Sequence, residues 1–152
     1  MTETFPIVPG SVKVVWIIVP LVLVLVGALA LLGHSLHGAQ SARFEVSPDG
    51  LRLRGDLYGR LIPGSQLRGG AARALDLRTE DALAPKFRTL GTAVPGYRAG
   101  WFRLRNKEKA LLYVTDPSRV VYLTTTAGYA VLVSVADPAA FIASVQRIAP
   151  QP

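Results

Sequence analysis

The chain has no cysteine, two histidines and ten acidic residues among 152. Without cysteine it can have no disulfide framework, no thiolate nucleophile and no cysteine-ligated metal, although this does not decide the compartment. His34 and His37 stand three apart and would share a helical face. A metal site needs three or four ligands, and the next candidates, Glu45 and Asp49, lie beyond the helix end expected at Gly38. We therefore predict no metal and no cofactor.

The few acidic residues form no recognisable catalytic constellation. Glu80 and Asp81 are adjacent, and adjacent side chains usually point apart. Asp116 could supply an acid, but Ser118 and Ser134 have no partner that the sequence can show, and catalysis needs a positioned acid or base. We predict that the protein is not an enzyme. A membrane-associated hydrolase is the least favoured alternative.

Acidic residues are also scarce relative to the 17 lysines and arginines, which leaves a formal charge of +7. Only Lys13 and Glu3 precede the region after residue 33, so the whole excess belongs to that region. A basic domain favours an anionic neighbour, and beside a bilayer that neighbour is the lipid headgroup. Trp101 alternates with Arg103 and Arg105, but one such strand lacks the companion aromatics of an RNA-binding sheet. No nucleic-acid partner is predicted.

The residues from Val14 to Gly33 carry no formal charge. A helix of about 20 residues at about 1.5 Å per residue matches the roughly 30 Å of a bilayer core. The run therefore predicts a transmembrane helix over residues 12–36, after a tail at 1–11 and before one domain at 42–150. This organisation is that of a single-pass protein of the cell membrane.

The apolar run exceeds the length of a signal-peptide core, and a single lysine, Lys13, precedes it, which favours an uncleaved anchor. Ala39-Gln40-Ser41 resembles a cleavage site, so cleavage stays open as the alternative. Lys13 on one side is balanced by Arg43 and Arg52 on the other. The short amino-terminal tail favours an extracytoplasmic domain, and the charges leave the side of the membrane open.

Alternating apolar and polar residues predict strands after residue 42. Pro48-Asp49-Gly50 has the composition of a tight turn between two such stretches, so a hairpin is expected there. Residues 64–72 and 79–100 are expected to be loops, the longer one near any ligand. The strands are expected at 44–46, 51–54, 58–62, 74–78, 101–105, 110–115, 119–124 and 129–135.

A helix is expected to follow the strands. Asp137 can cap it, Pro138 suits its first position, and Phe141, Val145 and Ile148 give it one apolar stripe. The last three strands are apolar on both faces, which predicts the core there. The fold class is therefore mainly β, an antiparallel sandwich or barrel of about seven strands with a C-terminal capping helix.

Several ordered segments resemble the bacterial pleckstrin-homology (PH) domain family of small membrane proteins. The resemblance covers residues 43–148, and its strongest segment is GYRAGWFRLRNKEKALL at 96–112. FEVSPDGLRLRGDLYGRLIP at 44–63 and ARALDL at 72–77 also contribute, as do the strands and helix start that follow. The chain departs from the family pattern at Lys107, where a glycine is expected, and at 123–126, where a proline is expected. Both departures fall in turns.

The resemblance implies a PH-like fold and a binding role, since some PH-like domains bind phosphoinositides and others bind proteins. It carries over no catalytic or ligand residues. A site for anionic headgroups would need basic residues that converge at one end of the sandwich. The candidates are Arg52, Arg54, Arg60, Arg98, Arg103 and Arg105.

The function predicted is a membrane-anchored, non-enzymatic binding or scaffolding module that contacts the lipid bilayer and a headgroup or protein partner. The alternative is a subunit of a membrane protein assembly that docks through the apolar helix. Small residues permit close helix approach, and they occur at Gly27, Ala28, Ala30 and Gly33. Ligand, partner and oligomeric state stay open.

Overall fold

The computed structural model describes residues 13, 15–55 and 57–150, so the tail predicted at 1–11 lies outside the described residues. The chain divides after His34 into two units, each described by itself below. Helix α1, Val15–Ser41, crosses this boundary and contains Pro20. The large apolar side chains described along it are all exposed.

The described part of the chain contains no helix that is both long enough and apolar enough to cross a membrane. The prediction of a transmembrane helix over residues 12–36 is therefore not supported. A helix does occupy most of that stretch, but it begins at Val15 and continues to Ser41.

The domain begins with a small antiparallel sheet in the order β1-β2-β3. Its strands are β1 Arg43–Ser47, β2 Gly50–Arg54 and β3 Arg60–Pro63. The predicted hairpin is confirmed, with Ser47 opposite Gly50 at its turn. Gly50 has a φ of +141°, a conformation that residues with a Cβ rarely adopt. Leu51 and Leu53 point to one face and are buried.

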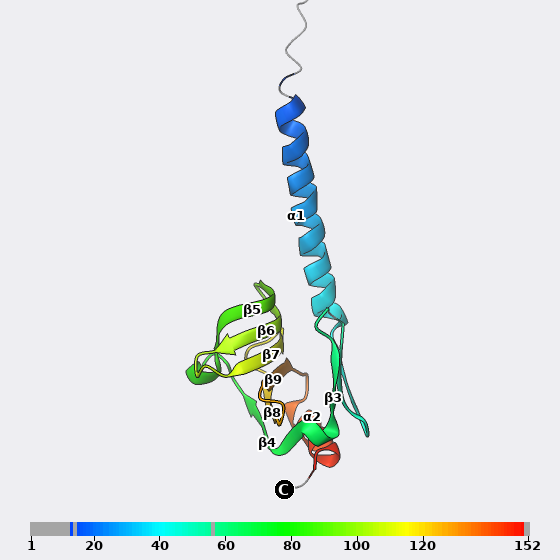
Figure 1. The fold of residues 1–152 in the computed structure, drawn as a ribbon, viewed down its shortest axis with the longest axis vertical. Coiled ribbons are helices and arrows are strands. Elements are labelled where there is room, and N and C mark those ends of the chain that lie inside the picture. The colour runs from blue at the N-terminus through cyan, green and yellow to red at the C-terminus, as the bar shows by residue number, and fades with distance from the viewer. Residues whose placement is uncertain (1–12, 14, 56, 151–152) are drawn as a thin grey trace, which may run out of the picture. The chain divides into compact units, whose positions relative to one another are not determined.

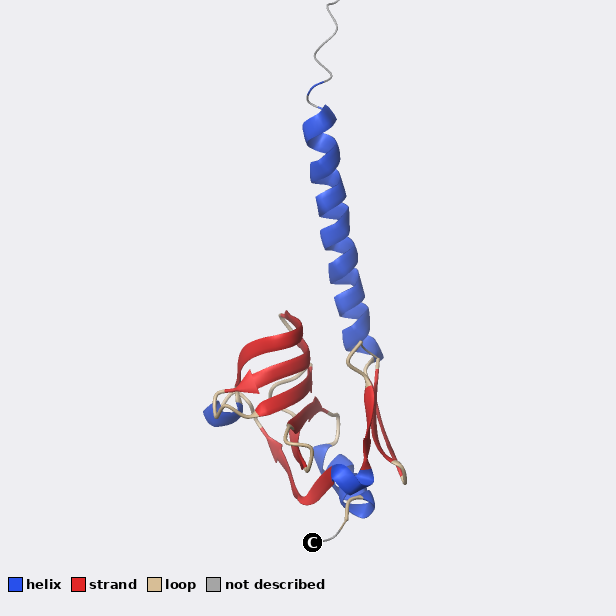
Figure 2. Ribbon diagram, in the orientation of Figure 1, coloured by secondary structure: helices blue, strands red, loops and turns tan. Residues whose placement is uncertain are grey.

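The second sheet has six strands in the order β4-β8-β9-β7-β6-β5. They are β4 Leu67–Leu75, β5 Pro85–Val94, β6 Tyr97–Leu104, β7 Lys109–Val114, β8 Val120–Thr125 and β9 Ala130–Ser134. All neighbours are antiparallel except β7 and β9, which are parallel. The expectation of a purely antiparallel sheet is therefore wrong. Figure 2 distinguishes these strands from the helices.

The described residues form nine strands. The strand that was not expected is β5, inside the predicted 79–100 loop, whereas the predicted 64–72 loop holds an earlier start of β4. Residues 64–72 hold the short 3₁₀ helix η2, Gly64–Gln66, and most of β4. Residues 79–100 hold the 3₁₀ helix η3, Asp81–Leu83, with β5 and the start of β6. β5 was not predicted because none of its residues is buried, so its sequence shows no alternation of apolar and polar residues.

Helix α2, Pro138–Ile148, closes the fold as predicted. The backbone N–H of Ala140 donates to Asp137 Oδ1 at 3.0 Å, which confirms the cap. Val145 is fully buried, and Phe141 and Ile148 pack beside it. A Cβ on Gly69 would lie 2.9 Å from that of Ala149, so this glycine lets β4 approach the helix closely and is not part of a flexible turn.

Two apolar cores lie on the two faces of the six-stranded sheet. One includes residues of both sheets and of α2, among them Leu53, Tyr113 and Val145. The other includes Phe102 and Leu132. As predicted, β7, β8 and β9 are buried on both faces. The domain is mainly β, with two sheets and a C-terminal helix, which is consistent with a PH-like fold (Figure 1).

Candidate ligand-binding surface

The six arginines proposed from the sequence do not meet at one place. Arg52 and Arg54 alternate with buried leucines on β2, so they point to the outer face of the small sheet. Arg54 Nε is 3.1 Å from Glu45 Oε2, so this arginine has a partner. Arg60 lies opposite Leu53 in the register and therefore shares its inward face.

The other three candidates are spread along β6 and beyond it. Arg98, near the first end of the strand, lies opposite Val114, and Arg103, near the other end, lies opposite Lys109. An odd separation of five residues places Arg98 and Arg103 on opposite faces of the sheet. Arg105 follows the strand and pairs with the Asp81 carboxylate at 2.6 Å. These arginines cannot act as one site.

Two separate hollows nevertheless lie beside the predicted residues. One of about 350 Å³ is lined by Arg52, Arg54 and Arg60 together with the glycines next to them. Another of about 360 Å³ is lined by Arg98 with Gly96 and the ends of β5 and β7. Both volumes are at the lower end of the range of small-molecule sites. The structure thus brings the first three arginines around one hollow and leaves Arg98 at the other.

The basic group that does form surrounds Trp101 on β6. Arg60 Cζ lies 4.8 Å from the centroid of the indole ring, and Lys109 Nζ lies 4.4 Å from it. The Tyr129 ring meets the indole edge to face, with centroids 5.0 Å apart. A ring attracts a cation placed over it, so the half-buried Trp101 holds one cation from β3 and one from β7.

We call Arg60, Trp101, Arg103 and Lys109 the Trp101 cluster. Among the described residues, no carboxylate forms an ion pair with Arg60 or Lys109. Arg103 lies directly opposite Lys109, a like-charge arrangement that opposes folding. Its Nη1 donates to the Lys107 carbonyl oxygen at 2.9 Å. Within the described residues, the cluster therefore gathers three cations with no ion-paired carboxylate.

Lys109 was missed by the sequence analysis, because it lies between the strands expected at 101–105 and 110–115. The shortness of the connection after Leu104 could have revealed Lys109, because a short connection brings the next strand back opposite Arg103. Arg60 and Arg103 were predicted, but as members of a larger set. Their meeting at Trp101 depends on the small sheet lying over β6, which local sequence does not specify.

The same face continues onto β5 through two exposed apolar side chains. Phe87 lies opposite Arg103 and Leu90 lies opposite Trp101 in the register. Their exposed fractions are 61% and 59%. Lys86 Nζ lies 5.2 Å from the centroid of the Phe87 ring. The cluster thus borders an apolar strip that carries a further cation.

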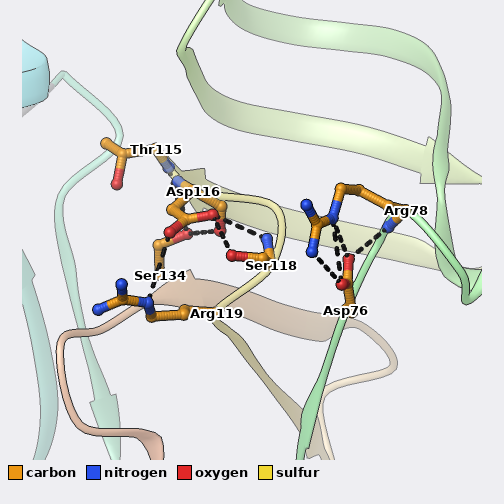
Figure 3. A network of polar contacts seen from close by, with 7 residues as sticks. All are labelled: Asp76, Arg78, Thr115, Asp116, Ser118, Arg119 and Ser134. Carbon is orange, nitrogen blue, oxygen red and sulfur yellow. Dashed lines mark hydrogen bonds and ion pairs between the residues drawn. The ribbon is translucent and has the colours of Figure 1, made fainter.

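A polar network at another corner of the domain contains the residues that a hydrolase would have used (Figure 3). Ser134 Oγ donates to the Asp116 carbonyl oxygen at 2.8 Å and accepts from two backbone N–H groups at 3.2 Å each. Ser118 donates to Asp116 Oδ1 through its backbone N–H at 2.9 Å and its hydroxyl at 2.6 Å. These contacts fix the turn between β7 and β8.

The carboxylates of this region are held in their ionised form. Hydrogen bonds from Ser118 lower the pKa of Asp116. Asp76, drawn in the same figure, accepts from Arg78 at 2.6 Å, and hydrogen bonds from this arginine lower its pKa. A general base that works near neutral pH needs a raised carboxyl pKa. In this structure both carboxylates form hydrogen bonds that hold the local turns.

The comparisons with known proteins address the domain and not its ligand. A family model described as "Bacterial PH domain" matches residues 42–149, nearly the same boundaries as the domain predicted at 42–150. No curated protein and no solved structure matches the chain.

Proposed function

Since the chain belongs to the bacterial PH domain family, we propose that it is a non-enzymatic binding module that takes up an anionic group on the Trp101 cluster at the cell membrane. The observation that carries the proposal is the pair of cations, Arg60 and Lys109, over one indole ring. The family supports a binding role, and the cluster supplies the chemistry.

An anionic ligand follows from the electrostatics of the cluster. Arg60 Cζ and Lys109 Nζ both lie within 4.8 Å of the centroid of the Trp101 ring, and in the proposal one phosphate or carboxylate contacts both cations. Contact with the ring also restricts the two long side chains, which lowers the entropy cost of ordering them around a ligand. The hollow beside Arg60 gives room for the rest of a headgroup.

The proposal places the module at a membrane because of α1. Trp16 is 83% exposed on this helix, and Leu31 is 71% exposed. Contiguous apolar surface of this kind favours contact with lipid or with another protein, at roughly 25 cal/mol for each Å² removed from water. Attachment to lipid through α1 is the first candidate, and the proposal does not require the helix to cross the bilayer.

A second candidate is a subunit that docks onto a membrane protein assembly through α1. The observation that favours it is the open space at Gly27 and Gly33, where an added Cβ would meet nothing within 4 Å. Small residues of this kind let a second helix approach closely. In this case a protein, and not lipid, covers the apolar surface.

Membrane attachment is tested by fractionating cells that express the full chain and washing the membranes with carbonate. Chain that stays in the membrane pellet after the wash supports attachment. Recovery of the chain in the soluble fraction before the carbonate wash would remove the membrane from the proposal, and release by the wash would indicate peripheral attachment. Crosslinking of the full chain in its membrane then separates the two candidates, because an assembly subunit gives a reproducible crosslinked partner through α1.

Anion binding is tested by co-sedimentation of the full chain with phosphatidylcholine vesicles, with and without phosphatidylserine, at low and high salt. The R60Q/K109Q variant should lose most of the gain from phosphatidylserine, roughly thirtyfold in partitioning if each cation contributes about 1 kcal/mol. The control R68Q/R147Q removes the same charge from β4 and α2 and should keep it. Equal losses in both variants would show diffuse attraction and refute a site at Trp101.

A further inference from the structure

Strand β5 forms one edge of the six-stranded sheet (Figure 1). It is ten residues long and pairs only with β6 among the strands that the structure describes. At an antiparallel edge, alternate residues direct their backbone N–H and C=O groups away from the neighbouring strand. An edge of this length can therefore accept another strand.

The two halves of β5 differ in regularity. Register shifts occur between Pro85 and Phe87 and between Arg88 and Leu90, whereas 90–94 pairs with 97–101 without interruption. Bulges twist an edge and hinder pairing. The regular edge available to an added strand is thus 90–94, and the bulged half lies directly before it.

The exposed side chains of the bulged half include two cations, which would favour an acidic partner. Lys86 and Arg88 are exposed, and no carboxylate among the described residues pairs with either. Arg88 lies opposite Phe102, on the other face from Phe87 and Leu90. An incoming strand would therefore meet Phe87 and Leu90 on one face of the sheet and Arg88 on the other.

We propose that β5 binds an acidic, partly apolar extended peptide, which adds a strand along 90–94 and places carboxylates near Lys86 and Arg88. β5 contains no acidic residue of its own. A second copy of the chain would bring the same two cations and no carboxylate to the edge, which disfavours pairing of β5 with itself. This inference goes beyond the anion site at Trp101 and does not depend on it.

The test selects peptides from a random eight-residue display library on the full chain in a neutral detergent. The selection should enrich peptides with alternating apolar and acidic residues. The strongest peptide is then synthesised in two forms, one unmodified and one with alternate backbone nitrogens methylated. Methylation keeps every charge but removes the donors that strand addition requires, so it should abolish binding measured by fluorescence anisotropy.

Two variants of the chain locate the binding. K86E/R88E should weaken the unmodified peptide by roughly tenfold or more, because two attractions become repulsions. F87S/L90S should also weaken it, and both substitutions are at exposed positions, so folding should be retained. The matched controls are R68E/R147E for charge and L61S for an exposed leucine of the small sheet, and neither should change the affinity.

Three alternative outcomes would each overturn the proposal. Failure to enrich acidic peptides, or binding that survives backbone methylation, would exclude strand addition. Dimers that F87S/L90S abolishes in analytical ultracentrifugation would identify a second copy as the occupant. Binding to anionic vesicles that depends on Lys86 and Arg88, in the absence of peptide binding, would identify lipid as the ligand of β5. Loss of vesicle binding in R60Q/K109Q with peptide binding intact would support this inference separately from the proposed function.

Discussion

Replacing Lys107 by glycine should stabilise the domain. Lys107 has a φ of +70° and is the only non-glycine residue with a positive φ in the described part of the chain. Its N–H donates to the Leu104 carbonyl at 3.0 Å, and the Leu104 N–H donates to that of Glu108 at 2.9 Å. These bonds close the turn from β6 to β7 around a left-handed residue, a position that glycine usually fills.

The expected gain follows from two opposing terms. A left-handed conformation costs a residue with a Cβ about 1–2 kcal/mol, and glycine avoids this cost. Glycine also gives the unfolded chain more freedom, which costs about 0.4–1 kcal/mol. The net prediction for K107G is a gain of about 0.5–1 kcal/mol in the free energy of unfolding.

The assay is urea unfolding of the full chain in neutral detergent, followed by Trp101 fluorescence. The chain has two tryptophans, so a W16F background leaves Trp101 as the only reporter. K107G should raise the midpoint with an unchanged slope. K107A removes the same charge but keeps the backbone cost, so it should match the parent within about 0.5 kcal/mol. A K107G midpoint no higher than that of K107A would refute the reasoning.

Three further predictions use the same chain. G50A should lose more than about 3 kcal/mol in the free energy of unfolding, because the added Cβ would lie 2.8 Å from Pro63 Cα. The control G70A, where an added Cβ would have open space around it, should leave the stability unchanged in the same urea assay. D137A should cost about 1 kcal/mol and D137S much less, measured by thermal unfolding. Burial and a hydrogen bond to a carboxylate raise the pKa of Tyr122 to about 12, so its stabilising contribution is complete below the unfolded pKa of about 10 and is lost as pH rises toward the folded value. An absorbance titration of Y122F should lack one of the late-titrating tyrosines of the parent.

Local sequence was sufficient where one short segment determines its own geometry. Pro48-Asp49-Gly50 specified the β1–β2 turn, since only glycine tolerates the φ found at its end. Asp137 and Pro138 specified the start of α2, because the cap and the fixed proline φ act within one helical turn. These elements formed as predicted because no distant contact competes with them.

Sequence pattern failed where a strand is defined by its neighbour. β5 has a proline, a glycine and two bulges, and its exposed side chains give no period of two. β6 alone supplies its register. The parallel pairing of β7 with β9 was missed for a related reason, because each strand is apolar on both faces and its sequence does not distinguish one neighbour from another.

The candidate site illustrates a third limit, since its residues come from three strands and share no spacing. Arg60 reaches Trp101 only because the small sheet lies over the large one, and Lys109 only because a turn places β7 beside β6. Such a gathering of cations lowers the stability of the fold, and exposed charges on a purely structural surface could separate at little cost. Proteins commonly accept this kind of loss where binding requires it. The three cations at Trp101, which form no ion pair with a described carboxylate, therefore argue for a ligand more strongly than the overall charge of +7 does. Net charge alone is compatible with any solvated basic surface.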